Sequence, residues 1–120
     1  MRLINGVHTI IFSRDAEAAR AFFRDVLEMP CVDAGHGWLI FALPPAELGI
    51  HPADSPESEN THRLYLMCED IEVTMAALKA KGVEFTGGIT NAGWGLLTSM
   101  KIPGGGELSI YQPRHASPIG

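Results

Sequence analysis

The chain has 120 residues, of which 46% are hydrophobic and 19% are charged, and its formal net charge is −5 at pH 7. This length and composition predict one domain with an apolar core. The negative charge argues against nucleic acid or an anionic membrane surface as a partner. No apolar run reaches the roughly 20 residues of a membrane-spanning helix, and the first six residues lack a signal peptide's apolar core. We therefore expect a cytoplasmic protein.

The first half of the chain predicts a strand, a helix and three further strands. Residues 6–13 alternate and contain isoleucine and phenylalanine, as is typical of a strand. Asp15 is a suitable N-cap, and the apolar residues after it recur with the spacing of a helix that buries one face. The next proline ends that helix. Further strands are expected at residues 30–34, 37–43 and 46–51.

The second half of the chain predicts the same order of elements. Residues 53–60 are polar and acidic, which indicates a linker. A strand over residues 62–68 precedes a helix that Asp70 caps and that ends at Gly82. Further strands are expected at residues 83–87, 95–102 and 106–112.

The two halves also repeat a sequence pattern. Residues 47–50 (Glu-Leu-Gly-Ile) are matched by residues 107–110 (Glu-Leu-Ser-Ile), and both stretches follow a turn rich in proline or glycine. Such a repeat predicts one βαβββ unit written twice. We interpret the chain as a single α+β domain of two modules, residues 4–52 and 61–113, joined by the linker and followed by a tail, residues 114–120.

The repeat also suggests where a site would lie. If the first and fourth strands of each module are neighbours, His8 lies beside Glu47, and the start of the strand at residues 62–68 lies beside Glu107. Alternate side chains of a strand share a face. Glu107 and Tyr111 would then point into a cleft between the modules. A glutamate at the start of a half-apolar strand also fits a carboxylate that simply faces water.

At this point the residues resemble the glyoxalase I, bleomycin-resistance and extradiol-dioxygenase superfamily, also called vicinal oxygen chelate proteins. The resemblance is carried by His8-Thr9 with Asp15 seven residues later, by residues 26–29 (Val-Leu-Glu-Met), by the Glu-Leu pairs at 47 and 107, and by the glycine turn before Glu107. It implies a curved, eight-stranded cup of two paired βαβββ modules, and a homodimer that shares the cup. In the metal-dependent members, a divalent metal holds two adjacent oxygens of a substrate.

The resemblance implies a ligand set for that metal. The glyoxalase I pattern matches His8, Glu47 and Glu107, and Glu107 would also be catalytic. One histidine and two carboxylates are enough for Ni, Zn, Mn or Fe with open coordination positions.

The expected fourth ligand is where this chain departs from the pattern. Seven positions before Asp70 stands Arg63, and His62 lies one residue off, on the face of Leu64. If Arg63 occupies the fourth position, we expect no metal, because its guanidinium would form an ion pair with Glu107.

Two functions follow from these residues. One is a divalent-metal-dependent lyase, isomerase or dioxygenase that acts on a small oxygenated molecule. The other is a metal-free protein of the bleomycin-resistance type that binds a small-molecule ligand. A dimeric ferredoxin-like barrel is a third interpretation, if the repeat is a coincidence. His115 lies in a tail that we expect to be mobile. The expected substrate-binding residues, some of which also fit a plain core or strand end, are Arg63, His51, Tyr111, Trp94 and Phe12.

Overall fold

The computed structural model describes residues 8–118, so the start of the first predicted strand and module and the last two residues of the tail lie outside the described residues. The fold is a mixture of helices and strands, as predicted. The helical elements are α1 (Ala16–Ala21), η1 (Phe22–Val26), η2 (Pro56–Ser58) and α2 (Ile71–Ala80). The strands are β1 (Cys31–Asp33), β2 (Leu39–Phe41), β3 (Tyr65–Met67), β4 (Thr90–Asn91), β5 (Gly95–Lys101) and β6 (Glu107–Pro113).

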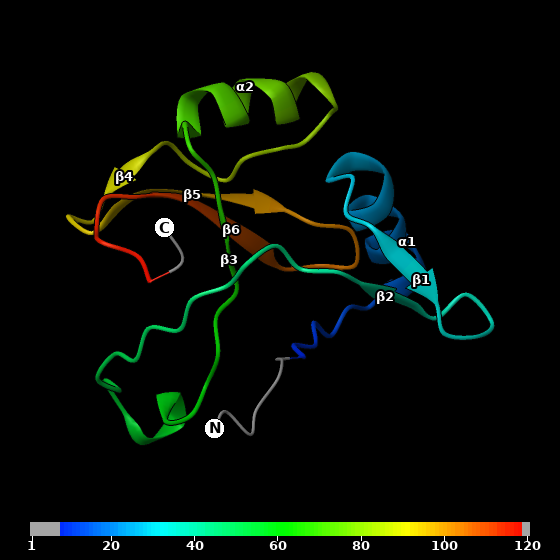
Figure 1. Ribbon diagram of the computed structural model, residues 1–120, viewed down its shortest axis with the longest axis horizontal. Helices are drawn as coiled ribbons and strands as arrows, with labels where there is room; N and C mark the ends of the chain where they lie inside the picture. Colours follow the sequence, from blue (N-terminus) through cyan, green and yellow to red (C-terminus); the bar gives the residue numbers. More distant parts are fainter. Residues whose placement is uncertain (1–7, 119–120) are drawn as a thin grey trace.

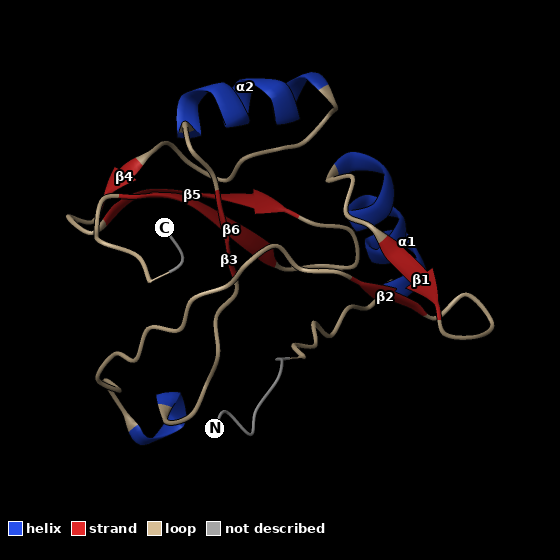
Figure 2. Ribbon diagram, in the orientation of Figure 1, coloured by secondary structure: helices blue, strands red, loops and turns tan. Residues whose placement is uncertain are grey.

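The strands form two sheets (Figure 2). β1 pairs antiparallel with β2, and the second sheet has the order β3-β6-β5-β4. β3 runs parallel to β6, with Tyr65 opposite Ser109, and β5 runs antiparallel to β6. The first and fourth predicted strands of the second module are therefore neighbours. The strand predicted at residues 83–87 contributes one bridge, between Phe85 and Met100.

Both long helical segments begin where their N-caps predict. The Asp15 carboxylate accepts a hydrogen bond from the backbone N–H of Ala18, and the Asp70 carboxylate accepts from the first turn of α2. α1 continues directly into the π-helical turn η1, so one helical segment ends before the next proline. Gly82 follows α2 at a φ of 88°, a left-handed conformation that glycine adopts without strain.

The hydrophobic core lies on one face of the four-stranded sheet. Leu108 and Ile110 of β6 are each 3% exposed and point toward the helices. Figure 1 shows α2 on one side of this sheet and the chain between β2 and β3 on the other. The core is formed by Phe22, Phe23, Ile71, Met75, Val83, Met100, Ile102, Leu108 and Ile110. Because residues alternate along β6, Glu107, Ser109 and Tyr111 belong to the opposite, open face.

The first module departs from the prediction. Residues 8–13 and 46–51 lie on no strand, so two of the predicted strands are missing from the described chain and the eight-stranded cup is not formed there. Both segments are apolar, yet Phe12 is 92%, Leu48 85% and Ile50 87% exposed. A strand needs a neighbouring backbone to accept and donate its ladder hydrogen bonds. Neither segment has such a neighbour among residues 8–118.

The two halves are joined at the glycine turn before β6. The Arg14 backbone N–H donates to the Gly104 carbonyl at 3.0 Å, and the Ser13 hydroxyl donates to the Pro103 carbonyl at 3.2 Å. Gly104 has a φ of +89°, and a Cβ there would lie 1.7 Å from the Ser13 Oγ. A glycine is therefore required for this contact. Of the helices in the described range, none has the length and apolarity needed to cross a membrane.

Candidate functional site

Three aromatic rings gather on the open face of the four-stranded sheet. We call Tyr65, Trp94 and Tyr111 the aromatic cluster. The centroid of the Tyr111 ring lies 5.4 Å from that of Trp94 and 5.7 Å from that of Tyr65, with interplanar angles of 72° and 84°. Tyr65 and Trp94 are 6.0 Å apart at 86°. All three pairs meet edge to face, which is the arrangement that the charge distribution of aromatic rings favours.

The backbone explains why these rings meet. β3 and β6 are parallel neighbours, so Tyr65 and Tyr111 project from adjacent strands on the same face. Gly95 opens β5 beside Tyr111, and a Cβ there would lie 2.9 Å from the Tyr111 ring and 3.0 Å from the Gln112 carbonyl. The glycine therefore leaves the space in which Tyr111 packs. Tyr111 is only 6% exposed.

A single carboxylate lies at the edge of the aromatic cluster. Glu47 accepts a hydrogen bond from the Tyr111 hydroxyl on Oε1 and one from the Ser117 hydroxyl on Oε2, the latter at 2.7 Å. Its side chain is 15% exposed. His115 completes this group, with its Nε2 3.3 Å from Glu47 Oε1 and 3.4 Å from the Tyr111 hydroxyl. Two distant parts of the chain, Glu47 and the stretch from Tyr111 to Ser117, thus meet at one point.

These contacts set the charge of the group. The hydrogen bonds from Tyr111 and then Ser117 hold the pKa of the Glu47 carboxyl below its usual value, and the nearby His115 adds to the effect. Burial, followed by the hydrogen bond to Glu47 and the charge of that carboxylate, raises the pKa of Tyr111 to about 12. Near neutral pH the site therefore offers an ionised acceptor, Glu47, held by a neutral phenol.

An open pocket of about 490 Å³ adjoins this group. Two of its lining residues, His115 and Ser117, are also neighbours of Glu47. Burial raises the pKa of the Cys68 thiol in its wall, so this cysteine is protonated and serves as a packing residue. The pocket is lined by Pro45, Met67, Cys68, Glu69, Gln112, Pro113, His115 and Ser117.

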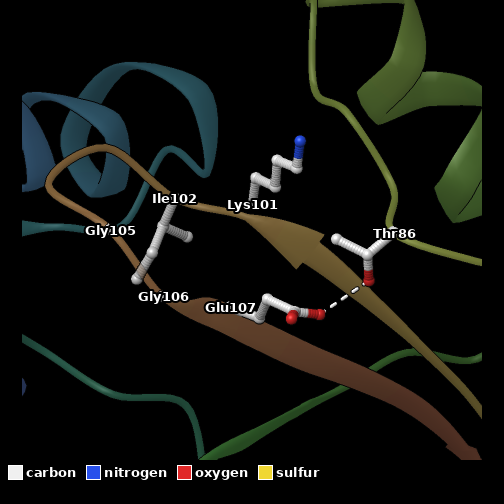
Figure 3. A pocket seen from close by; sticks show the side chains of 6 residues that line it. All are labelled: Thr86, Lys101, Ile102, Gly105, Gly106 and Glu107. Atoms are coloured by element: carbon white, nitrogen blue, oxygen red, sulfur yellow. Dashed lines mark hydrogen bonds between the residues drawn. The ribbon is translucent and has the colours of Figure 1, made fainter.

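Glu107 lies at the other end of β6, in a second and smaller pocket of about 260 Å³ (Figure 3). The Thr86 hydroxyl donates to Glu107 Oε1 at 2.6 Å. Lys101 lines the same pocket but turns toward Glu84, whose carboxylate lies 3.3 Å from the Lys101 ammonium. Glu107 is exposed and its carboxylate accepts this hydrogen bond from the neutral Thr86 hydroxyl, so the carboxylate can still bind a further partner.

The predicted metal ligands do not come together within one chain. His8 is exposed on the segment before α1, Glu47 accepts from Tyr111, and Glu107 accepts from Thr86. Among residues 8–118, no three histidine, cysteine or carboxylate side chains form a group that could hold a metal ion. The described part of a single chain therefore does not fit the metal that the resemblance implies. A ligand set drawn from two chains stays a prediction.

The predicted substrate-binding residues separate into two groups. The structure brings His51, Trp94 and Tyr111 together, with the His51 ring 6.2 Å from Trp94 at 88°. Phe12 does not join them, because it is 92% exposed on the unpaired N-terminal segment. Arg63 is exposed and precedes β3 by two residues. Continuing the pairing of Tyr65 with Ser109 would bring Arg63 level with Glu107.

Three members of the site, Tyr65, His115 and Ser117, were not among the predicted site residues. Strand parity does place Tyr65 on the open face, because Leu64, Leu66 and Cys68 pack against the core and the residues between them face the other way. His115 and Ser117 gave no such signal. They lie in a short polar tail, which is typical of mobile chain ends, whereas the structure holds both against Glu47.

Comparison with known proteins supports the interpretation of the fold. An antibiotic-binding protein from a Streptomyces species is 24% identical, with a TM-score of 0.66 over 94% of this chain and 99% of that chain. A lactoylglutathione lyase from Agrobacterium tumefaciens is 16% identical, with a TM-score of 0.63 over 92% and 96%. A superfamily member from Sphaerobacter thermophilus is 25% identical, with a TM-score of 0.60 over 92% and 99%.

In sequence, no curated protein matches the chain. The family model described as "Glyoxalase/Bleomycin resistance protein/Dioxygenase superfamily" matches residues 6–113, which includes both predicted modules almost completely. The chain therefore belongs to the glyoxalase/bleomycin resistance protein/dioxygenase superfamily.

Proposed function

We propose that this protein binds a small, partly aromatic organic molecule against the aromatic cluster, without a metal. The observation that carries the proposal is the combination of three edge-to-face rings with one ionised carboxylate, beside an open pocket of about 490 Å³. Pockets for small molecules are mostly apolar, with a few placed polar groups. The fold similarity to an antibiotic-binding protein supports the same function.

The chemistry of the site suggests how a ligand would be held. An aromatic ring of the ligand would pack against Trp94 and Tyr65, which are only half-buried, and each such contact contributes about 0.5–1.5 kcal/mol beyond burial. A donor on the ligand would bind Glu47, because a hydrogen bond to an ionised carboxylate is stronger than one between neutral groups. Tyr111 keeps that carboxylate in place.

Fluorescence of Trp94 tests this proposal. The chain has two tryptophans, so in Trp38→Phe all tryptophan emission comes from Trp94. We expect saturable quenching of this emission by bicyclic and tricyclic aromatic probes. The matched control is Trp94→Phe, in which Trp38 reports; its emission should not change, because it is exposed and lies outside the cluster. Absence of saturable quenching by any probe up to about 1 mM, where binding is worth roughly 4 kcal/mol, would refute the proposal.

A second candidate is a metal-dependent lyase, isomerase or dioxygenase assembled from two copies of the chain. The observation that favours it is the exposed Glu107 carboxylate in its own pocket, together with His8 on a segment that has no neighbouring strand among residues 8–118. A homodimer that paired this segment would move His8 from open solvent to a sheet. Carboxylates and imidazole together suit Mn, Fe, Ni or Zn.

Metal titration tests this second candidate. Protein purified without chelator or nickel resin should bind Ni²⁺, Mn²⁺ or Zn²⁺ in isothermal titration. We expect His8→Ala and Glu107→Ala each to abolish binding, because two remaining donors are too few, and His62→Ala to leave it unchanged. Arg63→His should tighten binding at least about tenfold, or about 1.4 kcal/mol. Loss of binding in His62→Ala would assign the ligand to His62 and show that the predicted register is wrong.

A further inference from the structure

We propose that His115 occupies the place of the ligand, and that the ligand it stands in for is a planar nitrogen heterocycle that presents an N–H group to Glu47. The inference rests on the proposed function and names its ligand class. It also gives the tail segment, residues 114–118, the role of an internal competitor that the ligand displaces.

The orientation of the His115 ring is the first observation. Tyr65 and Trp94 meet Tyr111 edge to face, whereas the His115 ring lies at only 23° to the Tyr111 ring, with the centroids 6.1 Å apart. His115 is therefore the ring that stacks on a face of Tyr111. A flat ligand in this same place would lie nearly parallel to the Tyr111 ring, as the His115 ring does.

The polar contacts of this ring are the second observation. One nitrogen, Nε2, lies 3.3 Å from Glu47 Oε1 and 3.4 Å from the Tyr111 hydroxyl. The other, Nδ1, lies 2.8 Å from the Ala116 carbonyl of the same tail. Because the Ala116 carbonyl can only accept, Nδ1 is the donor in that contact, and Nε2 donates to Glu47 in the protonated ring. The contact with Glu47 is thus made by a ring nitrogen in a stacked, planar group. An imidazole, pyrazole or benzimidazole ring would reproduce both the stacking and the contact.

The acceptor character of Glu47 restricts the ligand further. Glu47 is held as a carboxylate by two hydroxyl donors, so it can only accept. A ligand carboxylate at this place would be repelled by its charge. A hydrocarbon ring that displaced His115 and Ser117 would supply no donor in their place and would leave Glu47 Oε2 without the Ser117 hydroxyl, which costs more than the lost contact itself. A ring with an N–H group avoids both penalties.

The attachment of the tail segment allows such an exchange. The Arg114 backbone N–H donates to the Trp94 carbonyl at 2.9 Å, which anchors the chain where β6 ends. Beyond this anchor, the tail segment contacts Glu47 through the side chains of His115 and Ser117. The His115 side chain is 32% exposed. Both residues also line the open pocket of about 490 Å³, so their departure would join that pocket to Glu47. An occupant of this kind lowers the apparent affinity of the ligand by the fraction of molecules in which the site is free.

A pair of probes of nearly equal shape tests the inference. Benzimidazole and indene are both flat bicycles, but only benzimidazole carries an N–H group. Binding is measured through Trp94 emission in the Trp38→Phe protein. We expect His115→Ala to tighten benzimidazole binding at least about fivefold, because the competing ring is gone. Arg114→Ala, a change in the same tail whose side chain is exposed, is the matched control and should leave the affinity unchanged.

The role of Glu47 is tested with the same probes. In His115→Ala, benzimidazole should bind at least about tenfold more tightly than indene, and adding Glu47→Gln should remove most of this preference. If the double variant does not fold, the benzimidazole-to-indene ratio in His115→Ala alone decides. Equal affinity for the two probes, or an unchanged benzimidazole affinity in His115→Ala, would overturn the inference and leave aromatic binding intact. Failure of both probes to bind any variant would overturn the proposed function itself.

Discussion

The contact between the two halves at Gly104 gives the sharpest stability prediction. Gly104→Ala places a methyl group 1.7 Å from the Ser13 Oγ and 2.7 Å from the Asp15 backbone nitrogen, at a φ of +89°. Ser13 can rotate away, but the backbone of the α1 N-cap cannot move without disturbing the helix. The substitution therefore separates the turn from the start of α1.

The expected cost has two parts. A residue with a side chain in this left-handed region costs about 1–2 kcal/mol. Forced overpacking adds about 1–3 kcal/mol, and it includes loss of hydrogen bonds such as that from the Arg14 N–H to the Gly104 carbonyl. We expect a total loss of about 2–5 kcal/mol in the free energy of unfolding. Gly106→Ala is the matched control, because Gly106 has a φ of +87° with nothing within 4 Å of a Cβ; it should cost only the strain.

Urea unfolding followed by circular dichroism measures the difference between these two variants. Gly104→Ala should be less stable than Gly106→Ala by at least about 1 kcal/mol. Adding Ser13→Gly should recover part of the loss in Gly104→Ala and none in Gly106→Ala, because only Gly104 faces Ser13. Equal stability of the two alanine variants would mean that the turn does not pack against α1, and the reasoning would fail.

Three further predictions concern the site and the exposed apolar segments. Ultraviolet titration should show one of the two tyrosines ionising with a pKa of about 12. The free energy of unfolding should fall as the pH rises from 10.0 to about 12, since unfolding returns the pKa of that phenol to its ordinary value. Tyr111→Phe should remove both effects. Because the pKa of Glu47 is lowered in the folded state, its carboxylate stabilises the fold above pH 4.5, the pKa in the unfolded chain. This stabilisation is lost as the pH falls below that value, so Glu47→Gln should flatten the acid limb of the stability curve. Phe12→Asp should convert a homodimer to a monomer in light scattering, whereas Val73→Asp on the exposed face of α2 should not; a wild-type monomer of about 13.0 kDa would contradict the dimer.

The second half could be predicted from sequence because its signals are local. The alternation of Leu108 and Ile110 with polar neighbours marks β6, and Asp70 marks the start of α2. These elements then bury their apolar faces against one another within the same half. The pairing of β3 with β6 followed from the repeat, and the structure confirms it.

The candidate site was only partly predictable because its decisive contacts are long-range. Strand parity placed Tyr111 on the open face, and the structure agrees. Glu47 was assigned as a metal ligand through the resemblance to the glyoxalase I pattern, but within one chain it accepts a hydrogen bond from a phenol 64 residues away. No local pattern encodes that contact. His115 likewise reaches Glu47 through the path of the tail, which polar composition alone does not specify.

The contrast between the two halves has a physical explanation that bears on assembly. The second half pairs its first and fourth strands, whereas the matching segments of the first half carry exposed apolar side chains, with Phe12 at 92%, Leu48 at 85% and Ile50 at 87%. Burying a side chain of this size contributes about 1.5–3 kcal/mol, so burying these three on each of two copies offers roughly 9–18 kcal/mol. Association costs an estimated 4–15 kcal/mol. The exposed segments alone can therefore offset the cost of forming a homodimer, and His8 lies at the start of one of them. A metal that binds the wild-type protein but not a monomeric Phe12→Asp variant would place the ligand set between two chains.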